Sequence, residues 1–340
     1  MNLWEARDIR KNASEAYTIG IIGAGWISTA YHLPILHNTE GVHVSYVADI
    51  DYDQARNASR GYDAEPIEIG DSLKRLPDCD VVVLAIPLGA REQYVAEFAD
   101  RGTAIFSEKP FAVDEQMHRQ FLDTAELIGC NYMRTHYNAT VQLRRALEAG
   151  LFGVPDRIEL IEEGKTGATG FGKTHFQTSS EQSGGGILLE RGCHSLSQVL
   201  TLFPEYDISV TDADITYYKQ LDAEVSARLE MSNGDTLIEV EYLISRLRPI
   251  GSTLRVDCGS NALVTDPFDP SDQLRIEPLS GAGPTLTFDI EDTAATTTHQ
   301  AMWLRWREFL SALGNDNLDS ETETMPEVTR LIDDIYEEAQ

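Results

Sequence analysis

A short hydrophobic run that leads directly into a glycine-rich turn is the feature that most limits what this chain can fold into. Residues 17–22 are mostly apolar and include three isoleucines, and Gly23-Ala24-Gly25 follows without a break. Glycines at this point let the chain turn tightly and let a ligand approach the backbone closely. When such a turn begins a helix, the first helical N–H groups can bind a phosphate. The sequence therefore predicts a strand followed by a phosphate-binding turn.

Short β-branched runs alternate with helix-length stretches from Tyr17 to about Arg134, which is typical of βαβ units on a parallel sheet. The expected strands are 17–22, 42–48, 81–86, 104–107 and 131–135, and the expected helices are 26–36, 52–60, 91–101 and 114–128. These elements predict an α/β fold whose first domain, residues 17–136, is a doubly wound Rossmann sheet. Residues 1–16 form an N-terminal extension.

The pattern changes after an expected helix at 139–149, because strands then follow one another directly. Asn233-Gly234 separates two alternating runs, which is a strong hairpin signal. The expected strands are 157–162, 223–231, 236–242, 252–258, 261–265 and 273–276, and expected helices follow Gly186 and cover 299–313 and 326–338. The sequence predicts a second α/β domain at 137–340 with an open, largely antiparallel mixed sheet. Its C-terminal helices are expected to be able to pack back on the first domain.

The formal net charge of −29 disfavours polyanionic partners, so we expect neither nucleic-acid nor membrane binding. The chain has no apolar run near the roughly 18 residues that span a bilayer, and no secretory signal, which predicts a cytoplasmic protein.

Four scattered cysteines without a CxxC pair predict neither a metal site nor a disulfide framework. At about 1 M salt the Debye length is about 3 Å, so a halophilic source is a hypothesis for such an acidic chain.

The end of the second expected strand carries Asp49, where a carboxylate can accept hydrogen bonds from both adenosine ribose hydroxyls and repel a 2′-phosphate. With the turn Gly23, Gly25, Trp26 and Ile27, this residue predicts a dinucleotide site that favours NAD. Arg56 on the next helix can compensate a phosphate, so NADP stays open as the cofactor.

Two further segments carry side chains suited to proton transfer. Lys109 follows the strand at 104–107, and its ammonium group can polarise a substrate oxygen. Farther along, Gly184-Gly185-Gly186 precedes a helix on which Glu190 and His194 are four residues apart and share a face. A carboxylate there can orient the imidazole as a proton acceptor. An ordinary surface lysine and a solvated Glu–His pair are the competing interpretations.

A competing motif lies at Gly167–Thr174, whose residues satisfy the phosphate-loop pattern of nucleoside triphosphatases. Such a loop must lie between a strand and a helix, and the residues after Thr174 have no apolar helical period. A kinase-like function is therefore the weaker interpretation.

Taken together, these residues resemble the glucose–fructose oxidoreductase and myo-inositol dehydrogenase family over nearly the whole chain after Tyr17. The motifs that carry the resemblance are Gly23-Ala24-Gly25, His32-Leu33-Pro34, Ala85-Ile86-Pro87, Glu108-Lys109-Pro110, and the glycine run with Gly192 and His194. The resemblance implies hydride transfer between a nicotinamide and a secondary alcohol, ketone or lactol of a sugar, cyclitol or nucleotide sugar. It also implies a homodimer or homotetramer formed through the second sheet.

The resemblance implies catalytic roles for Lys109 and for His194, the proton acceptor, and cofactor contacts at Ile86, Pro87 and Glu108. Glu190 stands where the family usually has Asp, and Leu88 and Arg91 replace the family's usual Asn and His. Substrate contacts are expected from Arg134, His136, Lys173 and His175. Two alternatives stay open: an NAD-using glycosidase of the same family, and a non-catalytic regulator that senses NAD(P).

Overall fold

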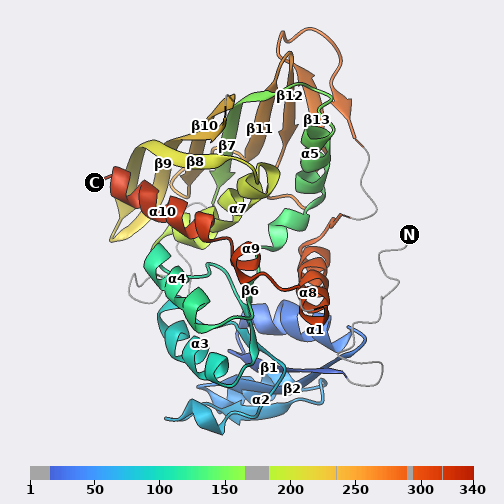
Figure 1. Cartoon of the computed structure of the whole chain (residues 1–340), viewed down its shortest axis with the longest axis vertical. Coiled ribbons are helices and arrows are strands. Elements are labelled where there is room, and N and C mark those ends of the chain that lie inside the picture. The colour runs from blue at the N-terminus through green and yellow to red at the C-terminus, as the bar shows by residue number, and fades with distance from the viewer. Residues whose placement is uncertain (1–15, 165–183, 235, 289–293, 316) are drawn as a thin grey trace. The chain divides into compact units, whose positions relative to one another are not determined.

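The computed structural model describes residues 16–164, 184–234, 236–288, 294–315 and 317–340 (Figure 1). The chain divides into two compact units. The first comprises residues up to Ala112 with Gln116–Asn131 and Met302–Pro326, and the second comprises Val113–Glu115, Tyr132–Ala301 and Glu327–Gln340. Lys173, His175 and the segment Gly167–Thr174 lie outside the described residues.

The first unit contains a six-stranded sheet in the order β3-β2-β1-β4-β5-β6, and all of its strand pairs are parallel. Its strands are β1 (Tyr17–Ile22), β2 (Val42–Asp49), β3 (Glu65–Glu68), β4 (Val81–Leu84), β5 (Ala104–Ser107) and β6 (Ile128–Cys130). The strand order reverses beside β1, and in doubly wound sheets ligands bind outside the carboxyl ends of the strands at this reversal. The predicted Rossmann sheet is confirmed.

The helical segments of the same region are short, apart from the 17-residue α8. They are η1 (Ser28–His32), α1 (Leu33–His37), α2 (Tyr52–Ser59), η2 (Leu73–Arg75), η3 (Leu88–Ala90), α3 (Arg91–Asp100), α4 (Glu115–Thr124), α8 (Thr298–Gly314) and α9 (Ser320–Thr324). Trp306 of α8 is fully buried and stacks on Phe106 of β5, with ring centroids 4.0 Å apart. The first unit therefore takes part of its aromatic core from the far end of the chain.

The last strand of this sheet differs from the prediction. The expected strand at 131–135 is wrong, because β6 occupies Ile128–Cys130 and Met133–His136 is a 3-10 helix, η4. The expected helix at 114–128 is also too long, since α4 ends at Thr124. The Phe309 ring packs against the backbone at Gly129. A Cβ added at this glycine would lie only 2.7 Å from the nearest ring atom. Ile128, where the expected helix ended, is thus the first residue of β6.

The second unit contains an eight-stranded sheet in the order β14-β13-β12-β11-β7-β10-β9-β8. Its strands are β7 (Pro155–Glu163), β8 (Asp207–Tyr218), β9 (Leu221–Asn233), β10 (Thr236–Ser245), β11 (Thr253–Cys258), β12 (Asn261–Thr265), β13 (Arg275–Pro278) and β14 (Leu286–Thr287). Only the β7–β10 pair is parallel among the strands described. Asn233 pairs with Thr236 across the hairpin, so the open mixed sheet and its Asn-Gly turn are both confirmed.

One face of this sheet is covered by α5 (Asn138–Glu148), α7 (Cys193–Leu202) and α10 (Pro326–Glu338) (Figure 1). The side chains that meet beneath α7 and α10 are apolar, and they include Leu160, Leu196, Leu229 and Leu331. Ion pairs such as Arg157–Glu241, at 2.7 Å, occupy exposed positions on neighbouring strands. Alternation of buried apolar and exposed charged residues therefore fixes which face of each strand is buried.

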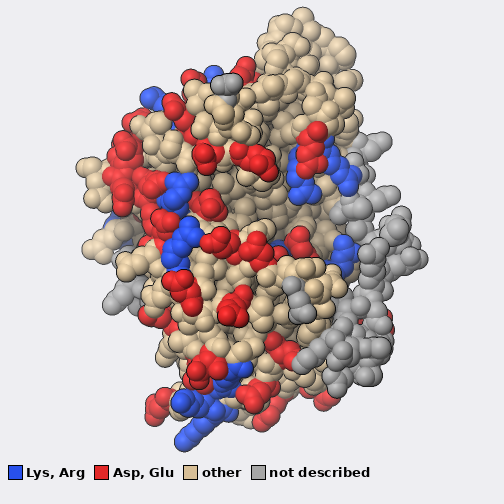
Figure 2. All heavy atoms as spheres, viewed as in Figure 1, with Lys and Arg blue, Asp and Glu red and all other residues tan. Residues whose placement is uncertain are grey.

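The sequence has 56 acidic and 27 basic residues, and many of the acidic side chains lie on the surface. Figure 2 shows Asp and Glu side chains spread over the face in view. None of the helices in the described part of the chain is long and apolar enough to cross a membrane.

Candidate active site

The two glycines of the turn after β1 have different surroundings. Gly23 cannot carry a side chain without a clash, whereas the space beside Gly25 is open. Gly23 has φ +96°, and a Cβ there would lie 2.4 Å from the Ala85 carbonyl oxygen. At Gly25 a Cβ would meet no atom within 4 Å. The buried Ser28 hydroxyl donates to the Gly23 carbonyl at 2.6 Å, which ties the turn to η1. The backbone at Gly25 is thus accessible to a ligand.

These surroundings predict opposite results for two matched substitutions. Gly23→Ala should destabilise the protein, because its backbone conformation and the Ala85 carbonyl both oppose a side chain. Gly25→Ala should leave the melting temperature within about 2 °C of wild type and weaken NADH binding about tenfold or more, because the methyl group occupies the space of the pyrophosphate. Thermal melts and NADH fluorescence titrations check both. Unchanged NADH affinity in Gly25→Ala would show that this turn does not hold the dinucleotide.

Asp49 lies at the carboxyl end of β2, beside this turn. One carboxylate oxygen accepts a hydrogen bond from the Ala24 N–H at 2.7 Å, and the other accepts one from the Asp51 N–H at 2.9 Å. Trp26 and Ile50, on the two adjoining turns, are 71% and 77% exposed. The arrangement gives the carboxyl edge a fixed anionic group flanked by apolar surface, which suits a ribose and an aromatic base.

Glu108 follows β5 and is held in a buried hydrogen-bond network. Its Oε1 accepts from Asn131 Nδ2 at 2.7 Å and lies 3.0 Å from His32 Nε2. The Trp306 indole donates to His32 Nδ1 at 3.0 Å, so the His32 proton on Nε2 is the one directed at Glu108. Burial would raise the pKa of the Glu108 carboxyl, but the hydrogen bonds from His32 and Asn131 and the Lys109 charge together hold that pKa below its usual value.

Lys109 is the next residue, and its backbone is fixed on both sides. Its N–H donates to Glu108 Oε2 at 3.3 Å. The Arg91 guanidinium is buried and donates to the carbonyls of Glu108, Pro110 and Phe111. It also donates to the Ile86 carbonyl at 3.2 Å, just before Pro87. The residue that departs from the family pattern at position 91 therefore fastens the two turns that carry the predicted residues Ile86, Pro87 and Lys109.

The glycine run of the second unit leads into η7 (Leu188–Gly192) and α7, and a buried aspartate binds the start of this helix. Asp222 accepts hydrogen bonds from the N–H groups of Gly186 and Leu188, at 2.5 and 2.7 Å, and from the Tyr336 hydroxyl at 2.8 Å. A Cβ on Gly186 would lie 2.2 Å from the Asp222 carbonyl oxygen. Burial first, and then the Asp222 charge, raise the pKa of Tyr336 well above its usual value.

His194 and Glu190 both lie on this helix. The His194 side chain is buried, and Glu190 Oε2 pairs with Arg246 Nη2 at 2.7 Å. Arg246 directly follows β10 and is also buried. The longer side chain at position 190 thus reaches a cation that no local sequence pattern places beside it.

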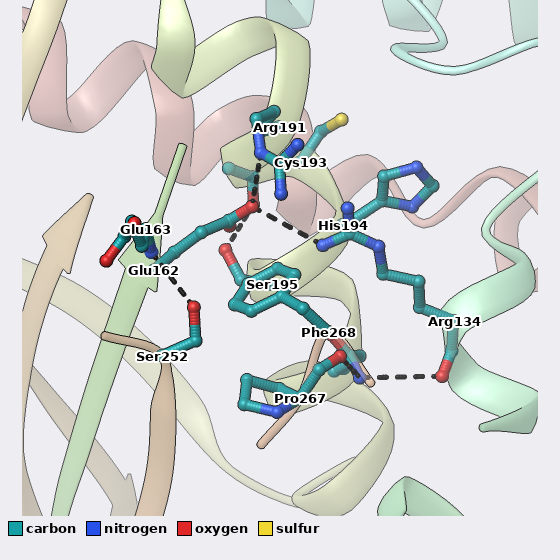
Figure 3. Close-up of polar contacts among 12 residues, drawn as sticks. Arg134, Glu162, Glu163, Arg191, Cys193, His194, Ser195, Ser252, Pro267 and Phe268 are labelled. Carbon is teal, nitrogen blue, oxygen red and sulfur yellow. Dashed lines mark hydrogen bonds and ion pairs between the residues drawn. The ribbon is translucent and has the colours of Figure 1, made fainter. Parts of the chain in front are cut away.

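A second charged cluster lies in the same unit (Figure 3). Glu162 of β7 is completely buried, and its Oε1 pairs with Arg191 Nε at 2.9 Å and with Arg134 Nη1 at 3.4 Å. Arg134 comes from η4, the 3-10 helix that also carries His136. Arg191 and Glu162 were missed at the sequence level. One sequence signal for Glu162 was its spacing, because it follows Ile158 and Leu160 at every second position of β7 and so points to the buried face of the sheet.

The first unit therefore contains the predicted cofactor residues and Lys109, and the second contains Glu190, His194, Arg134 and His136. The described residues include no group of three or more His, Cys, Asp or Glu side chains that could hold a metal ion.

Comparison with known proteins gives partial matches in sequence. Residues 17–136 match the model of an oxidoreductase family with an NAD-binding Rossmann fold. Inositol 2-dehydrogenase 4 of Saccharopolyspora erythraea is 26% identical over 160 residues, which cover 45% of this chain and 47% of that protein. Inositol 2-dehydrogenase of Burkholderia multivorans is 28% identical over 144 residues, or 40% of this chain and 43% of that protein. These matches span less than half the length of the curated relatives.

Comparison with solved structures extends to the whole fold. Levoglucosan dehydrogenase in complex with NADH has a TM-score of 0.81 at 16% identity, over 96% of this chain and 97% of that chain. The 3-ketoreductase KijD10 of Actinomadura kijaniata, in complex with NADP and TDP-benzene, has a TM-score of 0.79 at 17% identity, over 95% and 98%. Both share the two-unit architecture. The family match covers residues 17–136, and the structural matches extend the similarity of fold to nearly the whole chain.

Proposed function

We propose that this protein is an NAD(P)-dependent oxidoreductase that transfers a hydride between a nicotinamide and a secondary alcohol, ketone or lactol of a sugar, cyclitol or nucleotide sugar. The observation that carries the proposal is the rigid support of Lys109 at the carboxyl edge of a Rossmann sheet. Glu108, His32 and Asn131 hold one side of its backbone, and Arg91 holds the other. Such preorganisation suits a group that must meet a reacting atom in a fixed position.

The dinucleotide would be held by the turn at Gly23, Gly25, Trp26 and Ile27, with Asp49 accepting hydrogen bonds from the ribose hydroxyls. A bound nicotinamide supplies the carbon that accepts or returns the hydride. Asp49 supports a preference for NAD, because a 2′-phosphate would meet its charge at the end of β2. Arg56 pairs with Asp53 at 2.8 Å on an exposed surface. To bind the 2′-phosphate of NADP, Arg56 would have to leave this ion pair.

In the oxidising direction, Lys109 would donate a hydrogen bond to the substrate hydroxyl oxygen, and the His194 imidazole would take the hydroxyl proton. The carbinol C–H bond then breaks with its electron pair leaving as hydride, and the C=O double bond forms. Glu190, neutralised by Arg246, would orient the imidazole or bind a second hydroxyl. Arg134 and His136, and outside the described residues Lys173 and His175, are the proposed substrate contacts.

We also propose a cytoplasmic, salt-adapted protein that forms a homodimer or homotetramer through the second sheet. The net charge of −29 supports salt adaptation, because screening relieves its self-repulsion. The exposed ion-paired strands of the eight-stranded sheet offer the self-association surface. Full activity and an unchanged melting temperature after dialysis into low salt would contradict the salt adaptation.

The test of the proposed activity is NADH fluorescence at high salt with purified protein, NAD or NADP, and a panel of aldoses, cyclitols and nucleotide sugars. We expect reduced cofactor, NADH or NADPH, to accumulate with at least one member of the panel. The rate of its formation should be higher with NAD than with NADP. Cofactor binding with cleavage of a glycosidic bond and no NADH would favour the glycosidase alternative. Cofactor binding without any turnover would favour the regulator.

A further inference from the structure

We propose that the second unit holds a binding site for an anionic group of the substrate, a carboxylate or a phosphate, formed by Arg134 and Arg191. The site belongs to the proposed oxidoreductase and so rests on the proposed function. It narrows the substrate from any polyhydroxylated compound to a sugar that carries a negative charge.

Two guanidinium groups converge on one buried carboxylate. Arg191 Nε and Arg134 Nη1 pair with the same oxygen, Glu162 Oε1, at 2.9 and 3.4 Å. Figure 3 shows the two arginines reaching this carboxylate from η7 and η4. Since one negative charge faces two positive charges, the cluster retains an excess positive charge.

The remaining donors of both arginines are open. Among the residues that the structure describes, Nη2 of Arg134 and both Nη atoms of Arg191 have no hydrogen-bond acceptor. Both guanidinium groups also lie over the Phe268 ring, at 4.4 and 5.6 Å from its centroid. The ring covers one side of each guanidinium group. None of these N–H groups is among the buried polar groups that lack a partner, so a ligand can reach them.

The surroundings do not cancel this charge. Glu190 is the carboxylate that η7 itself carries, and it is already paired with Arg246 at 2.7 Å. In a chain of net charge −29, the overall field repels anions, so an anionic substrate requires dedicated cations at its site. The planar guanidinium fork matches the oxygens of a carboxylate or a phosphate.

The position of the cluster suits a substrate group. The Arg191 side chain is 26% exposed, the Arg134 side chain 10% and the Glu162 side chain 0%, so a ligand reaches Arg191 most readily and does not reach the carboxylate. Arg191 also precedes the candidate base His194 by one turn of the same continuous helix, η7 and α7. An anion held there would fix the orientation of the sugar near the imidazole.

Calorimetric titration tests the site without requiring turnover. The ligands are D-glucose, D-glucuronate, D-glucose 6-phosphate and UDP-glucose, with D-galactose and D-galacturonate as a second series, all at one fixed salt concentration and saturating NADH. We expect at least one anionic sugar to bind about tenfold or more tightly than its neutral parent. The tightest anion identifies the source of the charge as a sugar acid, a sugar phosphate or a nucleotide sugar.

Two variants should shift this preference in opposite directions. Arg191→Gln should weaken binding of the preferred anion about 10-fold to 100-fold, because it removes open donors and the excess charge. Glu162→Gln keeps an oxygen that can accept hydrogen bonds from Arg134 and Arg191, but it removes the negative charge that partly neutralises them. This variant should therefore bind the preferred anion about threefold or more tightly than wild type. Arg144→Gln, on α5 with a side chain that is 40% exposed, is the matched control and should bind like wild type.

A purely structural role of the cluster would weaken binding in both variants. Equal affinities for neutral and anionic sugars in both series would overturn the proposal, as would weaker anion binding in Glu162→Gln. Because binding is measured separately from NADH formation, either result leaves the proposed oxidoreductase activity to be judged by its own assay. If Arg191→Gln fails to fold, the sign of the Glu162→Gln effect still decides.

Discussion

His194→Ala should lower turnover by about 10²-fold to 10⁴-fold and leave the NADH dissociation constant within about twofold of wild type. The imidazole is the proposed proton acceptor, and it lies in the second unit, whereas the dinucleotide residues lie in the first. Its loss should therefore affect the chemical step and not cofactor binding. Steady-state kinetics and NADH fluorescence titrations on the same preparation measure the two effects.

Two further variants make this result specific. His194→Gln retains a polar side chain of similar length without a proton acceptor of suitable pKa, so it should lose as much turnover as His194→Ala. His43→Ala, at an exposed position of β2, is the control and should behave like wild type. Parallel losses of turnover and NADH binding would contradict the assignment of His194 as the base.

Asp222→Ala should destabilise the second unit by about 3–5 kcal/mol. The carboxylate accepts hydrogen bonds from two helix N-terminal N–H groups and the Tyr336 hydroxyl, and it is 2% exposed. Removing it leaves three buried donors without an acceptor and removes a negative charge from the start of the helix that carries Glu190 and His194. Urea unfolding at one fixed salt concentration, followed by far-UV circular dichroism, measures the loss.

Asp222→Asn refines the same prediction. The amide retains one oxygen, but its NH₂ group would face the Leu188 or the Gly186 N–H, so we expect a loss of about 2–4 kcal/mol. Asp207→Asn, at an exposed position of β8, should change the free energy of unfolding by no more than about 0.5 kcal/mol. If Asp222→Asn and Asp207→Asn were equally stable, Asp222 would not hold the helix start.

The sequence predicted the dinucleotide half of the protein most accurately, because its signals are local. β1 and β5 have the expected bounds, since each is a short, mostly apolar run that ends at a glycine turn or a polar segment. The prediction failed at 128–135, where Ile128–Cys130 form β6 and the expected strand at 131–135 is largely a 3-10 helix. There the partners are Phe309 and the neighbouring strand, which no local pattern shows.

The edge strand β8 was missed for a related reason. Its residues Asp207–Tyr218 mix acidic and apolar side chains and are largely exposed, as edge strands often are. Such a stretch lacks the hydrophobic density of a central strand. β3 and β14, which are short and also little buried, were missed in the same way.

The candidate site was only partly predictable, because its decisive contacts join distant residues. Glu190 and His194 follow from helical spacing, but the Arg246 partner of Glu190 lies 56 residues away. Glu162 and Arg134 are 28 residues apart, and their pairing depends on the placement of η4 against β7. Arg91 shows the same limit, because its acceptors are backbone carbonyls, which leave no trace in the sequence.

The most direct measurement of the central claim follows the hydride itself. NADH deuterated at the transferable position of its nicotinamide C4 is incubated with the protein and a pooled panel of keto sugars and keto cyclitols, and the products are analysed by mass spectrometry and NMR. The proposed oxidoreductase predicts one deuterium on a new carbinol carbon, with oxidised cofactor formed in equal amount. A product that carries no deuterium, or no product at all while NADH stays bound, would contradict it.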